Sequence, residues 1–493
     1  MSVRVARSDL NPTQIELIRK FLCLQPQDDT HRYNGAANQK FFVQPKPPVL
    51  FYQVDDTHVN LPYAIGWAIT QKPPNQDKTF PPAPIPFTGE LFEHQKPIEE
   101  EAYQQLLAKG TTTIGLYPGF GKTVVGAKLS SRLGLYTAII CHREFLCEQW
   151  EKTFKDFTGA TIWIVGATPP PPIIPHITIC MDTRVALLPK DYRDKIGCLI
   201  IDEAHALCTA SRIDCLLGWE PKYIIAETAT LIRRDGMHSM IQSMCGVHGI
   251  FKTSAKAFDV VKLETGFEPE TVKNVRGGLD FNALLKALVT SEYRNQLILS
   301  LIKQNPQRKI LVLTRLKDHI SILYQGIKNM GETVDYFAGN KKTYSDSRIL
   351  LGTISKIGTG FDEKTACPNF GGQRIDMLIL GTSIKDLALL EQSVGRIFRA
   401  EMPAVIDLVD NNTTLKSHYY NRKKWYQSRN ASISEVKMIP EDQAHKLGKG
   451  KKIIKTVYSL QGQVMTTNTN TTANAMTTNT TDIQDTADIP DDD

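Results

Sequence analysis

Two long stretches of this sequence repeat one pattern, in which short apolar runs alternate with segments of helical periodicity. The first stretch runs from residue 91 to about 249, and the second from about 309 to 410. Such alternation is typical of a parallel sheet with helices on both of its faces. A chain of 493 residues is also too long for a single hydrophobic core. We therefore expect an α/β protein with two tandem parallel-sheet domains.

The same pattern divides the chain into six predicted parts. They are an N-terminal accessory domain at 1–88, a first sheet domain at 89–250, an inter-lobe segment at 251–306, a second sheet domain at 307–412, a basic C-terminal extension at 413–459 and an acidic tail at 460–493. We expect a small accessory domain, β-rich or mixed, because Pro and Gly clusters break its apolar runs. The tail lacks the apolar residues of a core, so we expect it to be disordered.

Charge and cysteine content narrow the class of protein. The formal net charge is +6, and the tail carries six aspartates without Lys or Arg, which leaves +12 on the remainder. Such a basic body favours a polyanionic partner such as nucleic acid. The nine cysteines are odd in number and form no CxxC pair, so neither a disulfide framework nor a zinc site is indicated. Without an apolar run of roughly 18 residues or a signal core, we expect no membrane association and a reducing intracellular compartment.

The strongest local motif is Gly119-Phe120-Gly121-Lys122-Thr123, between the strand-like run TTTIGLY and a helical segment. Its glycines allow backbone N–H groups to surround a phosphate, Lys122 supplies a positive charge, and Thr123 offers a hydroxyl to Mg²⁺. The longer form of this motif has a glycine where this chain has Leu116. The motif therefore predicts a nucleotide-phosphate site, and a fortuitous glycine-rich turn is the alternative.

A second motif, Asp202-Glu203-Ala204-His205, directly follows the apolar strand CLII. At a strand end beside a phosphate loop, Asp202 can hold Mg²⁺ through water. Glu203 can orient and deprotonate the water that attacks the phosphate. Four polar residues after a strand can also be a solvated loop, but the preceding phosphate motif favours the catalytic interpretation.

Together these two motifs resemble motifs I and II of superfamily 2 helicases of the DEAH-box type, which are ATP-driven motors with two RecA-like domains. The resemblance implies ATP and Mg²⁺ as cofactors and assigns roles to further positions of the first lobe. Gln95 matches the glutamine that reads adenine, His142 and Arg143 match residues near the nucleic-acid backbone, and His205, Thr228 and Thr230 match the elements that couple hydrolysis to movement.

The second lobe completes the resemblance. Thr314 and Arg315 match motif IV and Thr353, Gly360 and Asp362 match motif V, which implies nucleic-acid contacts for the first three and nucleotide contacts for the last two. The run QSVGRIFR matches motif VI, and its spacing predicts Gln392, Arg396 and Arg399 one turn apart on one helix face. Arginines there stabilise charge on the γ-phosphate, so hydrolysis depends on closure of the two lobes. We assign Arg399 as the finger, with Arg396 and Gln392 contacting the γ-phosphate or water.

Four further segments carry a looser similarity: HREFLCEQW, RRDGM after motif III, EYRNQLILSLI before the second lobe and VIDLVD after motif VI. They resemble the XPB/RadD-like branch, and within it helicases of large cytoplasmic DNA viruses, including the poxviral transcript-release helicase. It implies a monomeric viral helicase or translocase acting on DNA more than RNA, within a transcription or replication complex in the host cytoplasm or the virion. The alternative is a transcript-release or remodelling ATPase that translocates without processive unwinding. A nuclease or interaction scaffold with a degenerate motor is the weaker third interpretation.

Overall fold

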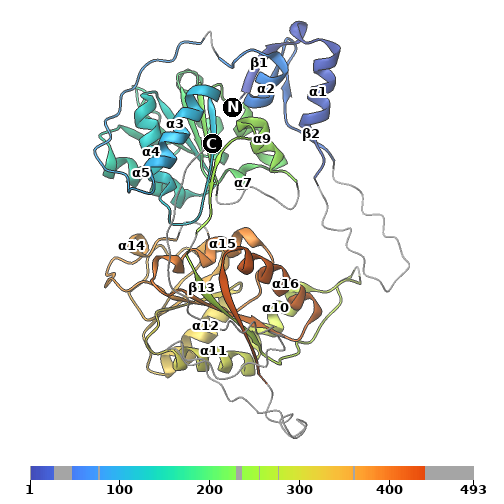
Figure 1. The fold of residues 1–493 in the computed structure, drawn as a ribbon, viewed down its shortest axis with the longest axis vertical. Helices are drawn as coiled ribbons and strands as arrows, with labels where there is room; N and C mark the ends of the chain where they lie inside the picture. The colour runs from blue at the N-terminus through green and yellow to red at the C-terminus, as the bar shows by residue number, and fades with distance from the viewer. Residues whose placement is uncertain are drawn as a thin grey trace, which may run out of the picture. The chain divides into compact units, whose positions relative to one another are not determined.

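The computed structural model describes residues 2–26, 47–75, 78–228, 236–254, 256–275, 277–358 and 361–438. Two seven-stranded parallel sheets dominate these residues. Figure 1 shows α3, α4, α5, α7 and α9 around the first sheet and α10, α11, α12, α14, α15 and α16 around the second. The expected α/β fold with two RecA-like domains is confirmed. Among the described helices, none is long and apolar enough to cross a membrane. The predicted acidic tail and residues 439–459 of the predicted extension lie outside the described residues.

The first sheet has the strand order β12-β6-β11-β10-β7-β9-β8, and every pair is parallel. Its strands are β6 (Thr111–Leu116), β7 (Thr137–Cys141), β8 (Ile162–Ile164), β9 (Ile177–Met181), β10 (Cys198–Ile201), β11 (Tyr223–Thr228) and β12 (Ile250–Lys252). The helices are α3 (Lys96–Lys109), α4 (Lys122–Leu133), α5 (Glu144–Phe157), α6 (Lys190–Arg193), α7 (Ala204–Leu207), α8 (Ile213–Leu217) and α9 (Ser239–Cys245). Because β11 lies between β6 and β10, the two motifs that follow β6 and β10 lie one strand apart at the same edge.

Both faces of the first sheet are buried, which explains why its strands are apolar without alternation. Ile200 and Ile225 pack into the core formed with α3, α4 and α5. Their neighbours Ile201 and Ala226 pack into a second core with α9. Successive strand residues point to opposite faces, so a sheet covered on both sides needs continuous apolar runs.

The N-terminal segment is mixed in structure and shares that second core. It contains β1 (Ser2–Ala6), α1 (Pro12–Leu22), β2 (Cys23–Leu24), β3 (Val49–Leu50), β4 (Gln53–Val54), β5 (His58–Pro62) and α2 (Tyr63–Thr70), with an antiparallel sheet of order β1-β5-β4. Leu22 and Phe51 belong to the same apolar cluster as Ala226. The backbone N–H of Ser2 also donates to the Trp219 carbonyl at 2.7 Å. The segment is therefore packed onto the first lobe.

The second sheet has the strand order β15-β16-β14-β17-β18-β13-β19. Its strands are β13 (Phe258–Glu264), β14 (Ile310–Thr314), β15 (Val334–Phe337), β16 (Ile349–Thr353), β17 (Met377–Leu380), β18 (Ala404–Val409) and β19 (Ala431–Lys437). The helices are α10 (Phe281–Thr290), α11 (Glu292–Gln304), α12 (Lys317–Asn329), α13 (Ile354–Gly358), α14 (Glu363–Ala366), α15 (Leu387–Val394) and α16 (Thr413–Ser428).

The second lobe extends beyond the limits expected from the sequence. β13 comes from the predicted inter-lobe segment, and α16 and β19 come from the predicted extension, yet both strands are part of the second sheet. β19 is an edge strand of mixed burial, and β13 contains charged residues, so neither has the continuous apolar run of a buried strand. Their pairing depends on contacts that are distant in sequence, which is why local patterns did not reveal it.

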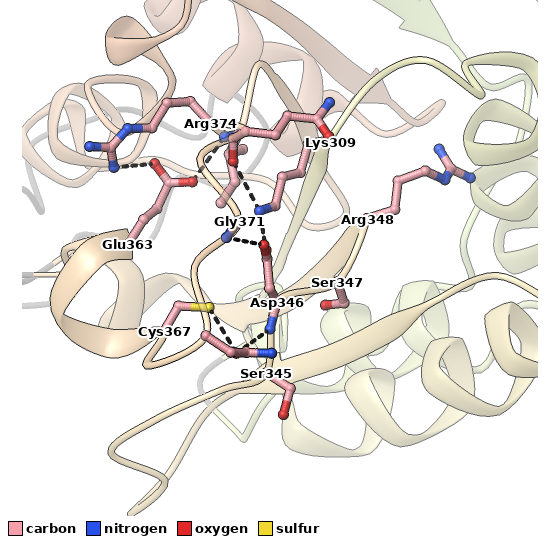
Figure 2. Close-up of polar contacts among 12 residues, drawn as sticks. Lys309, Ser345, Asp346, Ser347, Arg348, Glu363, Cys367, Gly371 and Arg374 are labelled. Carbon is pink, nitrogen blue, oxygen red and sulfur yellow. Dashed lines mark hydrogen bonds and ion pairs between the residues drawn. The ribbon is translucent and has the colours of Figure 1, made fainter.

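A buried ionic cluster lies at the N-terminal ends of three strands of the second sheet, β14, β16 and β17. The Lys309 amine is buried and bonds the carboxylate of Asp346 and the carbonyl of Gln373 (Figure 2). The Asp346 carboxylate also accepts from the Gly371 N–H at 2.7 Å. These contacts join the loops that lead into the three strands, far in sequence from the phosphate motif.

Candidate active site

The phosphate loop connects β6 to α4 and has the backbone that its glycines allow. Gly119 and Gly121 have φ angles of 88° and 93°, in the left-handed region that favours glycine. A Cβ on Gly121 would lie 2.4 Å from the Gln95 amide nitrogen, so this position also needs glycine for space. The Lys122 amine donates to the Leu116 carbonyl at 3.0 Å, across the loop. The loop thus ends at the N-terminus of a 12-residue helix, an arrangement that binds phosphate.

Gln95 is buried at the start of α3 and is fixed against this loop. Its amide nitrogen donates to the Phe120 carbonyl at 2.9 Å, and its amide oxygen accepts from the Phe92 N–H at 2.9 Å. The Phe92 ring is 69% exposed and stacks on His94 at a centroid distance of 5.7 Å. The structure therefore places an exposed aromatic surface beside the predicted adenine-reading glutamine.

The Asp-Glu-Ala-His segment begins where β10 ends, and its two acidic residues have different environments. Burial raises the pKa of Asp202 to about 7, and the charge of Glu203 adds to this effect. Burial also raises the pKa of Glu203, but the nearby His205 and Lys122 outweigh it, so that the net pKa lies below its ordinary value. The site therefore favours an ionised Glu203, the state that a general base requires.

The backbone of Glu203 is unusual because its φ angle is 47°. This left-handed conformation is uncommon for a residue other than glycine and is often found at functional sites. One oxygen of its partly buried carboxylate, Oε2, lies 3.3 Å from His205 Nδ1. The His205 ring therefore helps to hold this carboxylate in place.

Trp150 holds the neighbouring carboxylate. Its indole N–H donates to Asp202 Oδ2 at 3.0 Å, and the ring is fully buried against α4. Trp150 is thus part of the apolar core of the first lobe and makes a polar contact in addition. The chemistry of tryptophan could have indicated this contact, because a buried indole N–H needs a hydrogen-bond acceptor.

Two of the three predicted coupling residues of the first lobe, His205 and Thr228, are in contact. His205 Nδ1 lies 2.9 Å from the Thr228 hydroxyl at the end of β11, and 3.3 Å from Glu203 Oε2. Thr230 lies outside the described residues. His205 thus connects the candidate base to the strand that separates β6 from β10.

His142 and Arg143 follow β7 and differ in their surroundings. Arg143 is exposed, as a phosphate contact requires. His142 is partly buried, and burial lowers its pKa to about 4 even though Glu203 acts in the opposite direction. The His142 ring thus lies near the candidate base, and its contact with a nucleic-acid strand stays a prediction.

Two of the three predicted nucleic-acid residues of the second lobe are buried. The Thr314 hydroxyl is hydrogen-bonded to His319 at 2.8 Å and is 1% exposed, and Thr353 is also buried at the end of β16. Neither side chain is accessible to a nucleic-acid strand here, because each residue ends a strand that is covered on both faces. Arg315 is exposed and lies over the Phe281 ring at 5.8 Å.

The motif VI residues do not lie on one α-helix, which corrects the expectation from their spacing. α15 ends at Val394, and residues 397–399 form a 3-10 turn. Gly395 lies between them, and a Cβ there would lie 2.8 Å from Pro118 of the first lobe. The 3-10 turn changes the direction of the two arginine side chains, because it has about 3 residues per turn and an α-helix has about 3.6.

The arginines nevertheless face the phosphate loop. Arg399 Nε lies 3.6 Å from the position that a Cβ on Gly119 would occupy, and its guanidinium pairs with Asp362. The partly buried Arg396 donates to the carbonyls of Ile357 and Gly358 at 3.2 and 3.0 Å and lowers the pKa of Glu203.

Gln392 and the remaining motif V residues lie beside these arginines. Gln392 is buried, and its amide oxygen lies 3.6 Å from the position of a Cβ on Gly358. Asp362 caps α14 by accepting from the Thr365 N–H at 3.0 Å. Gly360 lies outside the described residues. Motifs V and VI are thus adjacent in the second lobe.

The oxygen atoms at this edge fit a Mg²⁺ ion that is also bound by phosphates. Thr123 lies in the first turn of α4, where its hydroxyl accepts from the Gln149 side-chain amide at 3.3 Å, and Asp202 directly follows β10. Among the described residues, the two carboxylate oxygens of Glu227 have no hydrogen-bond partner. No group of three or more ligating side chains within the described ranges could hold a metal ion by itself. This is the pattern of Mg²⁺ in nucleotide sites, where water and phosphate complete the coordination.

Comparison with known proteins identifies the family. The model of the "Type III restriction enzyme, res subunit" family matches residues 89–233. "Putative helicase 055L" of Frog virus 3 is 30% identical over 356 residues, which cover 70% of this chain and 80% of the relative. "Putative helicase 161L" of Invertebrate iridescent virus 6 is 28% identical over 408 residues, covering 77% and 90%.

Two further similarities are weaker. Transcript termination protein A18 of Camelpox virus is 24% identical over 351 residues, covering 62% of this chain and 67% of the relative. A fragment of an HsdR subunit of a type I restriction enzyme from Vibrio vulnificus has the same fold, with a TM-score of 0.50, 16% identity, and coverage of 71% of this chain and 70% of that chain. The chain belongs to the family of viral superfamily 2 helicases, and it is an ATP-hydrolysing helicase or translocase.

Proposed function

We propose that this chain hydrolyses ATP between its two lobes and uses the cycle to move along DNA during viral transcription or replication, in the host cytoplasm or the virion. The supporting observation is the convergence of both lobes on one carboxylate. Against the effect of burial, Lys122 of the first lobe and Arg396 of the second both lower the pKa of Glu203. Arg399 lies beside Gly119 of the phosphate loop.

Phosphate binding in this proposal requires groups from both lobes. The loop N–H groups around Gly121 and the N-terminus of α4 bind the β-phosphate. Lys122 exchanges the Leu116 carbonyl for a phosphate oxygen. Arg396 and Arg399 stabilise the charge that develops on the γ-phosphate, with Gln392 beside them. Hydrolysis then depends on the arrangement of the lobes, so that ATP turnover is coupled to movement of one lobe relative to the other.

The carboxylates organise the attack on the γ-phosphate. Asp202 and Thr123 would hold Mg²⁺, which would supply positive charge to the phosphates of ATP. Glu203 orients the attacking water and accepts its proton. Trp150 fixes the Asp202 carboxylate through its indole N–H.

Base recognition and strand binding use exposed groups. Gln95 reads the adenine edge, and the exposed Phe92 ring offers a stacking surface. Arg143 and Arg315 bind backbone phosphates, so binding is tolerant of sequence and sensitive to salt. His205 transmits the state of the site to β11 through Thr228.

The similarity to a transcript termination protein favours a second candidate, in which the motor releases transcripts without processive unwinding. ATPase stimulation by single- and double-stranded DNA and RNA, measured beside strand-displacement and stalled-transcript release assays, separates the candidates. DNA stimulation with displacement supports the first, and transcript release without displacement supports the second.

Variants of each lobe test the shared site. Lys122→Ala and Arg399→Ala are each expected to lower ATP turnover by about 10³-fold or more. Strand binding without nucleotide should be retained, because neither residue is placed in the strand path. Full turnover in Arg399→Ala would exclude the proposed contribution of the second lobe.

A further inference from the structure

Glu227 carries a buried carboxyl that no role described above uses. It lies in β11, immediately before Thr228, and is 1% exposed. Among the described residues, neither of its carboxylate oxygens has a hydrogen-bond partner. Burying an unpaired carboxylate is unfavourable, so a buried group of this kind calls for a specific explanation, such as a role in binding an ion.

The sheet register places Glu227 beside Asp202. Ile201 of β10 is paired with Ala226 of β11, so the next residues along the two parallel strands are Asp202 and Glu227. Adjacent positions of paired strands direct their side chains to the same face, with a strand spacing of about 4.8 Å. Both carboxyls therefore project toward α4 and α5.

Glycine on α4 makes room for this carboxyl. A Cβ on Gly126 would lie 2.6 Å from Glu227 Oε1 and 2.8 Å from Cη2 of Trp150. Gly126 lies one turn after Thr123 on α4. The Glu227 carboxyl is thus beneath the first turn of α4, next to the indole that holds Asp202.

We propose that Glu227 belongs to the Mg²⁺ site, where its carboxylate accepts hydrogen bonds from water molecules bound to the ion. This inference rests on the proposed function, in which Thr123 and Asp202 hold that ion. Mg²⁺ keeps several of its waters in nucleotide sites, and those waters need acceptors. The two carboxylate oxygens of Glu227, beside the strand β10 that leads to Asp202, supply these acceptors.

The charge balance supports the same assignment. Burial raises the pKa of the Glu227 carboxyl well above its ordinary value, Asp202 adds to the rise, and Lys122 opposes it. The charge of Glu203 also raises the pKa of Glu227, so two neighbouring carboxylates oppose the one lysine that lowers it. A divalent cation acts on Glu227 in the same sense as Lys122 and compensates the excess negative charge.

The test is metal binding, measured with Mn²⁺ as an octahedral oxygen-binding substitute for Mg²⁺. Mn²⁺ is titrated into the full chain with ADP and followed by electron paramagnetic resonance. Glu227→Gln is expected to weaken Mn²⁺ binding about tenfold, because it removes the charge of an outer acceptor. ADP affinity in EDTA should be unchanged, and unchanged Mn²⁺ affinity would overturn the inference.

Two controls separate this inference from the proposed function. Asp202→Asn should abolish Mn²⁺ binding, and if it does while Glu227→Gln has no effect, only the role of Glu227 is lost. If Asp202→Asn also binds Mn²⁺ normally, the proposed ligand set is wrong. Glu363→Gln, another buried carboxyl, is the matched variant and should leave Mn²⁺ affinity unchanged. If Glu227→Gln does not fold, Glu227→Asp is the substitute, and its shortened side chain should weaken binding likewise.

Discussion

The two lobes each bury a cluster of charged side chains, and the clusters differ in how completely their charges are paired. In the second lobe, Lys309 and Asp346 are bonded to each other and to surrounding backbone groups (Figure 2). In the first lobe, both carboxylate oxygens of Glu227 have no hydrogen-bond partner among the described residues. A satisfied cluster fixes loops in place, whereas an unsatisfied one retains binding capacity for a substrate and its ion. The difference separates a structural cluster from a catalytic one.

The largest expected effect is that of Glu203→Gln on catalysis. Turnover should fall about 10²- to 10⁴-fold, because the amide cannot accept the proton of the attacking water. The free energy of unfolding should change little, because the amide keeps the shape of the side chain and leaves an oxygen acceptor beside His205. ATPase assays and thermal unfolding of the same preparation check both. Near-normal turnover would show that the charged cluster of the first lobe is not catalytic.

Lys309→Met should produce the opposite pattern. Without the amine, the Asp346 carboxylate loses its charged partner, and the free energy of unfolding should fall by about 3 kcal/mol. Turnover per folded molecule should remain that of the parent chain. Lys303→Met, an exposed lysine on α11, is the matched control and should change neither quantity. A Lys309→Met protein as stable as the parent would show that the cluster is not structural.

The smallest effect is expected for Trp150→Phe. Loss of the indole hydrogen bond to Asp202 should lower turnover about tenfold, the equivalent of one hydrogen bond to a charged group. Trp163→Phe is the matched variant, because that indole donates only to the Thr168 carbonyl at 3.2 Å in the same lobe. Equal losses in both variants would mean that Trp150 acts through packing alone.

The local sequence was sufficient to predict a site residue where the position of that residue depends only on its own segment of the chain. The loop glycines, Lys122 and the Asp202-Glu203 pair follow strands whose apolar runs are evident, so their position at one sheet edge could be predicted. The helix face of Gln392, Arg396 and Arg399 was predicted wrongly, because the chain tightens to a 3-10 turn where Gly395 approaches Pro118. That approach involves a residue nearly three hundred positions away, which no local pattern contains.

Composition, periodicity and motif order by themselves determined the class of this protein: two parallel-sheet lobes with nucleotide chemistry at their edges. Tertiary structure decided which side chains are available for that chemistry. It buried Thr314, exposed Phe92, bonded Trp150 to Asp202 and left Glu227 without a partner. Hydrogen-bond satisfaction and burial depend on neighbours from other strands and helices, so only the folded chain specifies them.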